Sequence, residues 1–332
     1  MSRIEPINAH VTILDSLRAF AALSVCTFHF VCTTTGFINT KWILSLFSIG
    51  QYGVQTFFVI SGFVIPWSMY NAGFKIKNFF SFFLKRLSRL EPPYLFSLTI
   101  AIVILFLRNT YYSQIPGSIN LSGMQIFLHF GYLIPFFENY KWLNVVYWTL
   151  AVEFQYYFFM ALLFLPLIKS KLMMRYCIYL MIFGLSFFSD REFLLYWLPI
   201  FFLGVLLFLK MTNLISSKEY FVVTLFTLCF SFYKYPPLLV VFSILPVLFV
   251  LFYKNLKIYI LDGIGKFSYS LYLVHTIIGA TFINVLSHYA DTILLKIVVI
   301  LFGFLISILS SWITYRIVEK PSKRLSASIK YK

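Results

Sequence analysis

The first long apolar segment of the chain contains three ionisable side chains whose types and spacing could do chemistry. Arg18 and His29 are eleven positions apart. At about 100° per residue, an α-helix would place them on one face, about 16 Å apart along its axis. Asp15 falls close to the same stripe. A guanidinium suits phosphates, and histidine is the usual general base near neutral pH. The spacing therefore predicts an anion-binding cation and a base at two depths of one helix.

A structural interpretation of the same residues is also open. Arg18 could reach the inner lipid headgroups and pair with Asp15, while His29 could hydrogen-bond a neighbouring helix. An arginine in the middle of a membrane helix costs roughly 2.5–3.5 kcal/mol on translocon scales, and buried ionisable groups usually face a cavity. The pair in register therefore favours a functional site.

A second apolar segment contains Glu153, within the sequence WTLAVEFQYYFF. On a helix, Thr149 and Tyr157 share its face at i−4 and i+4, and Trp148 is of a type that marks membrane interfaces. Glu153 and His29 would both lie in the outer half of the bilayer. If their helices are neighbours, they form a candidate acid/base pair.

A third polar stripe occurs in GKFSYSLYLVHTIIG, where Tyr272, Ser268 and Gly279 lie at i−3, i−7 and i+4 from His275. Two interpretations of His275 stay open. It is either a functional group facing a cavity or a histidine satisfied by an interhelical hydrogen bond.

A basic segment, FFLKRLSRLEPPYLF, contains Arg86 and Arg89, three positions apart and followed by Pro92–Pro93, which are expected to end that helical face. Such clusters ordinarily set membrane topology. Together with Arg18 at the same inner surface, they predict a site for an anionic, phosphate-bearing ligand from the cytosol.

Long membrane helices are needed to position these residues. Of 332 residues, 61% are hydrophobic and 11% are charged. Apolar runs of roughly 17–22 residues, enough to cross ~30 Å of hydrocarbon, recur throughout. The sequence predicts an all-α, polytopic membrane protein with one domain over residues 1–332 and about ten helices in one bundle. The predicted spans are 12–34, 52–70, 92–108, 148–168, 174–189, 193–209, 219–233, 236–253, 266–287 and 292–315.

The basic residues orient these spans. The net charge is +16, and a cytoplasmic N-terminus would place 20 of the 27 Lys and Arg residues in inner segments and six outside, with Arg18 inside the first span. This distribution follows the positive-inside rule and predicts that both termini are cytoplasmic. Attraction to anionic membrane lipids is a sufficient use for the charge, so no nucleic-acid partner is expected.

The remaining segments predict little chemistry. The cysteines have no CxxC spacing, so neither a disulfide nor a metal site is expected: Cys26, Cys32, Cys177 and Cys229. Residues 109–147 lie outside in this topology, and their apolar part, 124–137, is too short to span comfortably. A re-entrant or interfacial segment over the outer mouth of the bundle is expected there. Neither a cleavable signal peptide nor an appended soluble domain is expected.

Several of these motifs resemble those of the membrane-bound acyltransferase-3 family. The resemblance lies in LRAFAALSVCTFHF (an Arg-x10-His signature), GVQTFFVISGFVI, KRLSRLEPPY, YWTLAVEFQYYFF, GKFSYSLYLVH and YRIVEKPSKRL. The six motifs occur in the family's order from residue 14 to about 325. Each is weak alone, and together they are specific.

The resemblance implies an O-acyltransferase of a bacterial inner membrane. It would move an acyl group, commonly acetyl, from the cytosolic co-substrate acyl-CoA to a hydroxyl of a saccharide or lipid-linked glycan of the cell surface, with no permanently bound cofactor. His29 corresponds to the catalytic histidine, as a base or an acyl carrier. Further correspondences place Arg18, Arg86 and Arg89 on the donor side, Ser61 and Gly62 near the acyl group, and Glu153 at the acidic position.

Two residues depart from the family pattern. Thr149 replaces the commoner serine and keeps the hydroxyl, whereas Glu91 lies where the family is usually uncharged and is expected to weaken anion binding. Some family members carry a soluble esterase-like domain that is not seen in this sequence, so acceptor selection is expected within the membrane part.

Two other functions fit parts of the sequence. A proton-coupled transporter or glycan/lipid flippase could use Glu153 and His275 as a proton relay. Transporters often contain two similar halves, and the Arg18/His29 span has no counterpart in the second half. A glycosyltransferase would need an acidic outer loop, which 11 scattered acidic residues do not provide.

Overall fold

The computed structural model describes residues 11–33, 37–111 and 121–331, and every regular element in these ranges is helical, which confirms the all-α prediction. The longer helices are α1 (Ile13–Cys32), α3 (Gly53–Asn71), α4 (Phe79–Tyr111), α6 (Tyr147–Lys169), α7 (Leu172–Leu185), α8 (Leu194–Met211), α9 (Ser217–Lys234), α10 (Pro237–Tyr253) and α14 (Ile293–Thr314). Shorter elements are α2 (Lys41–Ser48), η1 (Ile49–Tyr52), η2 (Ile76–Asn78), α5 (Gly123–Phe130), η3 (Ile134–Phe136), α11 (Tyr259–Gly265), α12 (Ser268–Val274), η4 (His275–Ala280), α13 (Thr281–Leu286), η5 (Ser287–Tyr289), η6 (Tyr315–Glu319) and α15 (Lys320–Ser328).

Each of the ten predicted spans overlaps helix in the structure, although residues 186–189 lie beyond the end of α7 and residue 34 lies outside the described residues. Seven helical stretches within the described ranges are long and apolar enough to cross a bilayer: Ile13–Cys32, Lys41–Asn71, Ile76–Tyr111, Tyr147–Lys169, Leu194–Met211, Ser268–Tyr289 and Ile293–Ser328. Helices α7, α9 and α10 are not among them. The chain is therefore a helical membrane protein, and the number of ten crossings stays a prediction.

Helix α4 differs from its prediction because it continues through Pro92 and Pro93. Each proline removes one backbone donor, but a membrane helix tolerates proline where neighbouring groups satisfy the freed backbone. The carbonyls that these prolines leave without an amide partner are those of Ser88 and Arg89, and next to them the Tyr269 hydroxyl donates to the Leu90 carbonyl at 3.0 Å. Arg86 and Arg89 therefore lie on a continuous helix rather than in a loop that the prolines end.

The predicted span 266–287 is not one regular α-helix. It consists of α12, a π-helical turn η4 and α13, and a second π turn, η6, joins α14 to α15. Each π turn changes the register of the side chains that follow it, and such turns often occur at functional sites.

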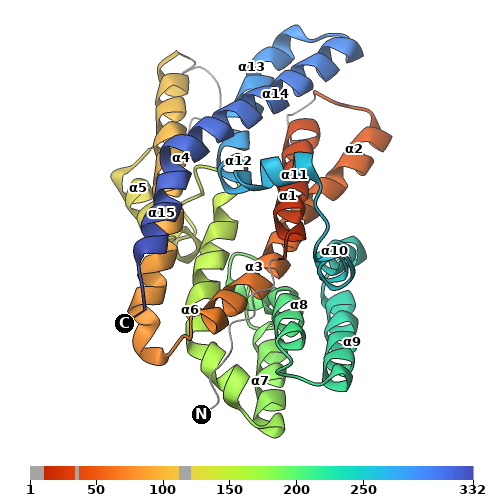
Figure 1. Ribbon diagram of the computed structural model, residues 1–332. Helices are drawn as coiled ribbons and strands as arrows, with labels where there is room; N and C mark the ends of the chain where they lie inside the picture. Colours follow the sequence, from red (N-terminus) through yellow and green to blue (C-terminus); the bar gives the residue numbers. More distant parts are fainter. Residues whose placement is uncertain (1–10, 34–36, 112–120, 332) are drawn as a thin grey trace.

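Helix α1 lies in the middle of the molecule, with α3, α10, α11 and α12 around it (Figure 1). Helices α3 and α8 pack closely because two glycines meet in their interface. A Cβ atom on Gly62 would lie 2.1 Å from the Phe201 carbonyl oxygen, and one on Gly204 would lie 2.1 Å from that of Val59. This close approach fixes α3 against the rest of the bundle.

The described part of the segment between α4 and α6 contains two short helices, α5 and η3, neither long enough to cross a membrane. Its 112–120 portion lies outside the described residues. The buried side chain of His129 ties α5 in place: Nδ1 lies 2.7 Å from the Gln125 carbonyl oxygen, and Nε2 accepts from the Leu143 amide at 3.1 Å. Since a carbonyl oxygen cannot donate, Nδ1 is the protonated nitrogen.

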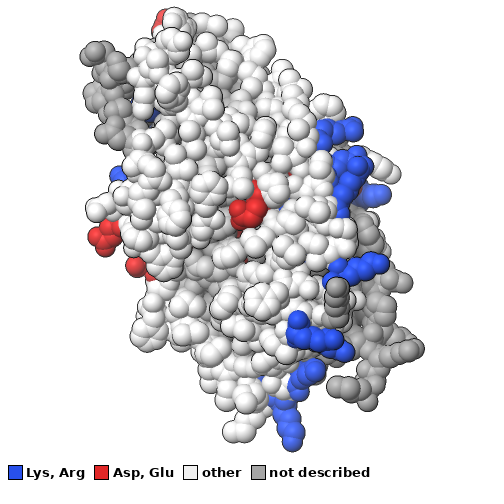
Figure 2. Space-filling model, turned by 90° about the vertical axis from the view of Figure 1, so that its left-hand side faces the viewer, with Lys and Arg blue, Asp and Glu red and all other residues white. Residues whose placement is uncertain are grey.

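The charged side chains are unevenly distributed over the surface. On the face shown in Figure 2, most visible Lys and Arg side chains form a band along the right-hand edge, while Asp and Glu lie toward the opposite edge and near the centre. A single basic edge agrees with one cytoplasmic face, as the positive-inside rule requires. The orientation of the termini stays a prediction.

Candidate active site

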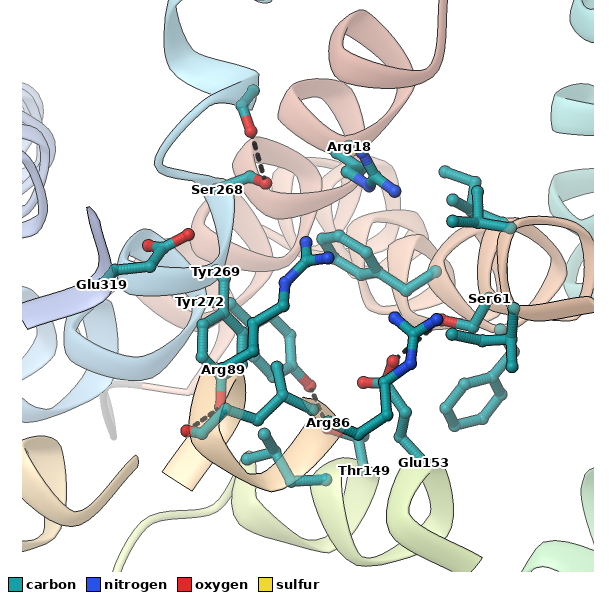
Figure 3. A pocket seen from close by; sticks show the side chains of 18 of the residues that line it. Arg18, Ser61, Arg86, Arg89, Thr149, Glu153, Ser268, Tyr269, Tyr272 and Glu319 are labelled. Carbon is teal, nitrogen blue, oxygen red and sulfur yellow. Dashed lines mark hydrogen bonds between the residues drawn. The ribbon is translucent and has the colours of Figure 1, made fainter. Parts of the chain in front are cut away.

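The three arginines predicted to bind an anion line one cavity of about 300 Å³. Figure 3 shows the guanidinium groups of Arg18, Arg86 and Arg89 pointing into the same space, although they come from α1 and α4. The sequence predicted that they share one membrane surface. Their convergence on one cavity depends on how α1 and α4 are arranged across the bundle, which no sequence pattern specifies. This cavity is called the inner cavity below, a name that follows the predicted topology.

The three guanidinium groups differ in their partners. Arg18 pairs with Asp15 at 3.1 Å, the contact that the structural interpretation of these residues allowed for. Arg86 is buried and donates to the Ser68 hydroxyl at 3.0 Å, while its Nε atom has no hydrogen-bond partner within the described part of the chain. Arg89 has neither a hydrogen bond nor a salt bridge to the residues that the structure describes. The inner cavity therefore keeps guanidinium N–H groups available for an anion.

Glu153 also lies in the inner cavity and accepts two hydrogen bonds. The Ser61 hydroxyl donates to it at 3.0 Å and the Tyr157 hydroxyl at 2.6 Å. Gly62, the neighbour of Ser61, does not line the cavity and instead provides the close packing of α3 on α8. Ser61 therefore faces the inner cavity, whereas Gly62 lies in the interface between α3 and α8.

Charged residues that the sequence analysis did not single out complete the inner cavity: Lys266, Glu319 and Lys323. Glu319 is buried, accepts from the backbone amide and hydroxyl of Ser270, and pairs with Lys323 at 2.6 Å. With these residues, the lining contains five cations and three carboxylates. The motif YRIVEKPSKRL was a possible signal, but its lysines were assigned only to membrane topology.

His29 lines a different cavity, of about 450 Å³. This cavity is called the outer cavity below, again after the predicted topology. Its lining is aromatic with several polar groups, and it includes Trp148. Its other lining residues include Phe28, Gln51, Tyr52, Gln55, Trp142, Arg191, Glu192, Tyr196 and Trp197. Residues 142–146, just before α6, line it in part, so the end of the segment predicted at the outer mouth does reach this cavity.

Val54 and Tyr272 line both cavities and lie between them. The Tyr272 hydroxyl forms a hydrogen bond with the Thr149 hydroxyl at 2.9 Å. Arg18 and His29 share one helix, but they do not line one continuous groove along it, because the structure has two cavities that meet at this tyrosine. The spacing predicted that Arg18 and His29 lie apart along one helix, but it could not show that each would line a separate cavity.

The structure does not bring His29 and Glu153 together, because they line opposite cavities. It brings His29 close to His275 instead, with ring centroids 5.2 Å apart. His275 is the first residue of η4, and its side chain is fully buried. The position of His29 along its helix was predictable from the sequence, whereas its contact with His275 on another helix was not.

These features define a polytopic helical membrane protein with a basic cavity and an aromatic cavity that meet at its centre. Residues 11–316 match the model of a family described as an acyltransferase domain, acyltransferase-3, and the chain belongs to this family. The match confirms the resemblance inferred from the six motifs.

Relatives of the chain occur in Staphylococcus aureus. A protein of strain COL named "Putative O-acetyltransferase" is 27% identical over 218 residues, which cover 63% of this chain and 31% of that protein. O-acetyltransferase OatA of strain NCTC 8325 is 33% identical over 91 residues, which cover 27% of this chain and 13% of OatA. The chain thus spans about a third or less of these relatives' length. No solved structure matches the chain.

Proposed function

We propose that the protein is a bacterial inner-membrane O-acetyltransferase that moves an acetyl group from cytosolic acetyl-CoA to a hydroxyl of an extracytoplasmic surface polysaccharide. The observation that carries this proposal is the convergence of three guanidinium groups on a cavity that meets the cavity of His29 at Tyr272. Membership of the acyltransferase family supports the reaction class.

The inner cavity suits the donor. Coenzyme A carries a diphosphate and a phosphate monoester, and arginine forks bind such groups through charge-assisted hydrogen bonds. The cavity's excess of cations over carboxylates favours this polyanion. Arg89 and the Nε atom of Arg86 offer donors that no described residue uses. The thioester end of the donor would then point toward Tyr272.

The outer cavity suits a sugar acceptor. Aromatic faces such as Trp148 and Trp197 can pack on the apolar face of a pyranose, and the amides of Gln51 and Gln55 can bind its hydroxyls. The Gln55 Oε1 atom is buried and has no hydrogen-bond partner among the described residues, so an acceptor hydroxyl would satisfy it.

The chemical step is assigned to His29. In direct transfer, its imidazole takes the proton of the acceptor hydroxyl, the oxygen attacks the thioester carbonyl, and the C–S bond breaks. The proton then passes to the coenzyme A thiolate. Alternatively, the imidazole first carries the acetyl group itself and then passes it to the hydroxyl. In either case the acetyl group must pass the constriction at Tyr272, which we propose opens when donor binds.

The test is acetyl-CoA turnover by the purified protein in detergent. Wild type should release free thiol from acetyl-CoA, and His29→Ala should lower this rate about 10²–10⁴-fold, the usual contribution of a positioned base. Retained turnover in a folded His29→Ala variant would remove His29 from the chemistry. No turnover by wild type would contradict the enzyme and favour a flippase.

The acceptor is tested separately in cells. Mass spectrometry of the surface polysaccharide from a deletion strain should show the loss of an acetyl group, and complementation with wild type but not with His29→Ala should restore it. An unchanged polysaccharide would reject this class of acceptor.

A further inference from the structure

We propose that His275 is a positioning residue that fixes the tautomer and the orientation of the His29 ring, so that one nitrogen of His29 faces the outer cavity as a free base. This inference rests on the proposed function and adds a role for a residue behind the acceptor cavity. Three observations support this role: the hydrogen bonds of the His275 ring, its complete burial, and its short distance from the His29 ring.

The hydrogen bonds of His275 determine which of its nitrogens carries the proton. Its Nδ1 atom lies 3.1 Å from the carbonyl oxygen of Leu271 and 2.9 Å from that of Tyr272. A carbonyl oxygen can only accept, so Nδ1 must be the donor. In the neutral ring the lone pair then lies on Nε2, and His275 offers an acceptor on the side away from its own helix.

That acceptor is buried and unused. The Nε2 atom of His275 has no hydrogen-bond partner among the described residues, and the side chain is 0% exposed. Buried polar atoms nearly always have a partner, so a donor is expected here in the working state of the protein.

His29 is the polar neighbour that can supply the donor. The two imidazole centroids are 5.2 Å apart, close to the separation of two rings joined end to end by an N–H···N bond, and the planes are inclined by 51°. The other rings beside His275 are Phe30 and Tyr272. The Tyr272 hydroxyl is already engaged with Thr149. A modest rotation of the partly buried His29 ring would complete the bond.

The helix that carries His275 is held in place on its far side. The π turn η4 begins at this residue, and Gly279 within it packs so closely that a Cβ atom there would lie 2.1 Å from the Ser307 hydroxyl oxygen of α14. His275 is therefore the fixed partner, and the less buried His29 ring is the one that adjusts to it.

The pair has a defined role in the reaction. One His29 nitrogen donates to Nε2 of His275, so its other nitrogen keeps its lone pair toward the acceptor hydroxyl. When His29 takes the hydroxyl proton, the same hydrogen bond stabilises the resulting imidazolium, and no proton moves to His275. A carboxylate has the corresponding role in serine-histidine-aspartate sites.

Two substitutions separate this role from simple packing. His275→Gln places an amide oxygen where Nε2 lies, whereas His275→Asn keeps an amide donor near the carbonyls of Leu271 and Tyr272 but leaves no acceptor for His29. For acetyl-CoA turnover in detergent, His275→Asn should lower kcat about 10- to 100-fold with little change in KM, and His275→Gln should keep most of the wild-type kcat.

A spectroscopic measurement checks the tautomer without relying on activity. The chain has five histidines, so 15N-histidine spectra are simple enough to assign His29 by its loss in His29→Ala. His29 should show one tautomer in wild type and in His275→Gln, and a mixture of both in His275→Asn. If the variants do not fold, the wild-type spectrum decides.

The outcomes distinguish this inference from the proposed function. A mixed tautomer of His29 in wild type, or equal kcat values for folded Gln and Asn variants, overturns the role of His275. A single tautomer in wild type without any acetyl-CoA turnover supports the histidine pair and rejects the acetyltransferase.

Discussion

At the scale of single residues, Arg89 is the clearest candidate for a contact made only with ligand, because it lines the inner cavity without a hydrogen bond or salt bridge to the described residues. Arg18 also pairs with Asp15, and Arg86 also donates to Ser68. Substituting either arginine would therefore remove contacts within the protein as well as a contact with the donor. Substitution of Arg89 therefore isolates the contribution of one guanidinium to donor binding.

Arg89→Gln should raise the KM for acetyl-CoA about 10- to 100-fold, since a hydrogen bond to a charged group contributes about 1.5–3 kcal/mol. Arg324→Gln is the matched control, because Arg324 is exposed and does not line either cavity. Steady-state kinetics in detergent measures both variants. An unchanged KM in Arg89→Gln would show that this guanidinium does not contact the donor.

His129 gives a prediction for pH. Burial lowers the pKa of His129, so its ring stays neutral in the folded protein at a pH where the unfolded chain already binds a proton. As the pH falls below about 6.5, the free energy of unfolding should decrease, by at most about 1.4 kcal/mol per pH unit from this group, until the folded ring also protonates.

Thermal unfolding in detergent between pH 7.5 and pH 5 tests this contribution. His129→Gln should lose part of the pH dependence, whereas His288→Gln, at an exposed position, should keep it. Equal pH dependence in wild type and His129→Gln would mean that the group does not control stability in this range.

At the scale of elements, the contact between α3 and α8 depends on the absence of two side chains. Gly204→Ala should destabilise the protein by about 1–3 kcal/mol, because its methyl group would overlap the Val59 carbonyl oxygen and force the helices apart. Gly184→Ala in α7 is the matched control, since a Cβ there has nothing within 4 Å. Denaturation midpoints that do not differ between the two variants would contradict this close packing.

The elements also show what could be read from the sequence and what could not. All ten apolar runs became helices, because length and hydrophobicity alone favour helix in a bilayer. The continuation of α4 through Pro92 and Pro93 could not be read from the sequence, because proline ordinarily ends or kinks a helix. The π turn that begins at His275 was likewise not predicted from the sequence.

The same distinction applies to the candidate site. The spacing of Arg18 and His29 identified two depths, and both residues line cavities. Spacing contains no information about which face of a helix meets which neighbour. Consequently the partner expected for His29, Glu153, lies in the other cavity, and Lys323 and Glu319 were not recognised as part of the site.

At the scale of the whole molecule, the basic edge predicts the orientation in the membrane. Reporter fusions ending at Lys77 should be cytoplasmic, and fusions ending at Asp190 should be on the opposite side, because the segments around them differ in Lys and Arg content. A reporter at Lys77 that is active only outside the cytoplasm would reverse the topology and with it the assignment of donor and acceptor cavities.

The closure at Val54 and Tyr272 has a consequence for the cell as well as for catalysis. In the proposed function the two cavities open to opposite faces of the membrane, and Val54 and Tyr272 would then form the barrier between them. A tyrosine that closes this barrier while no donor is bound would let a cell keep its electrochemical gradient. Insulation against ions would then be a second reason for a large side chain at this position.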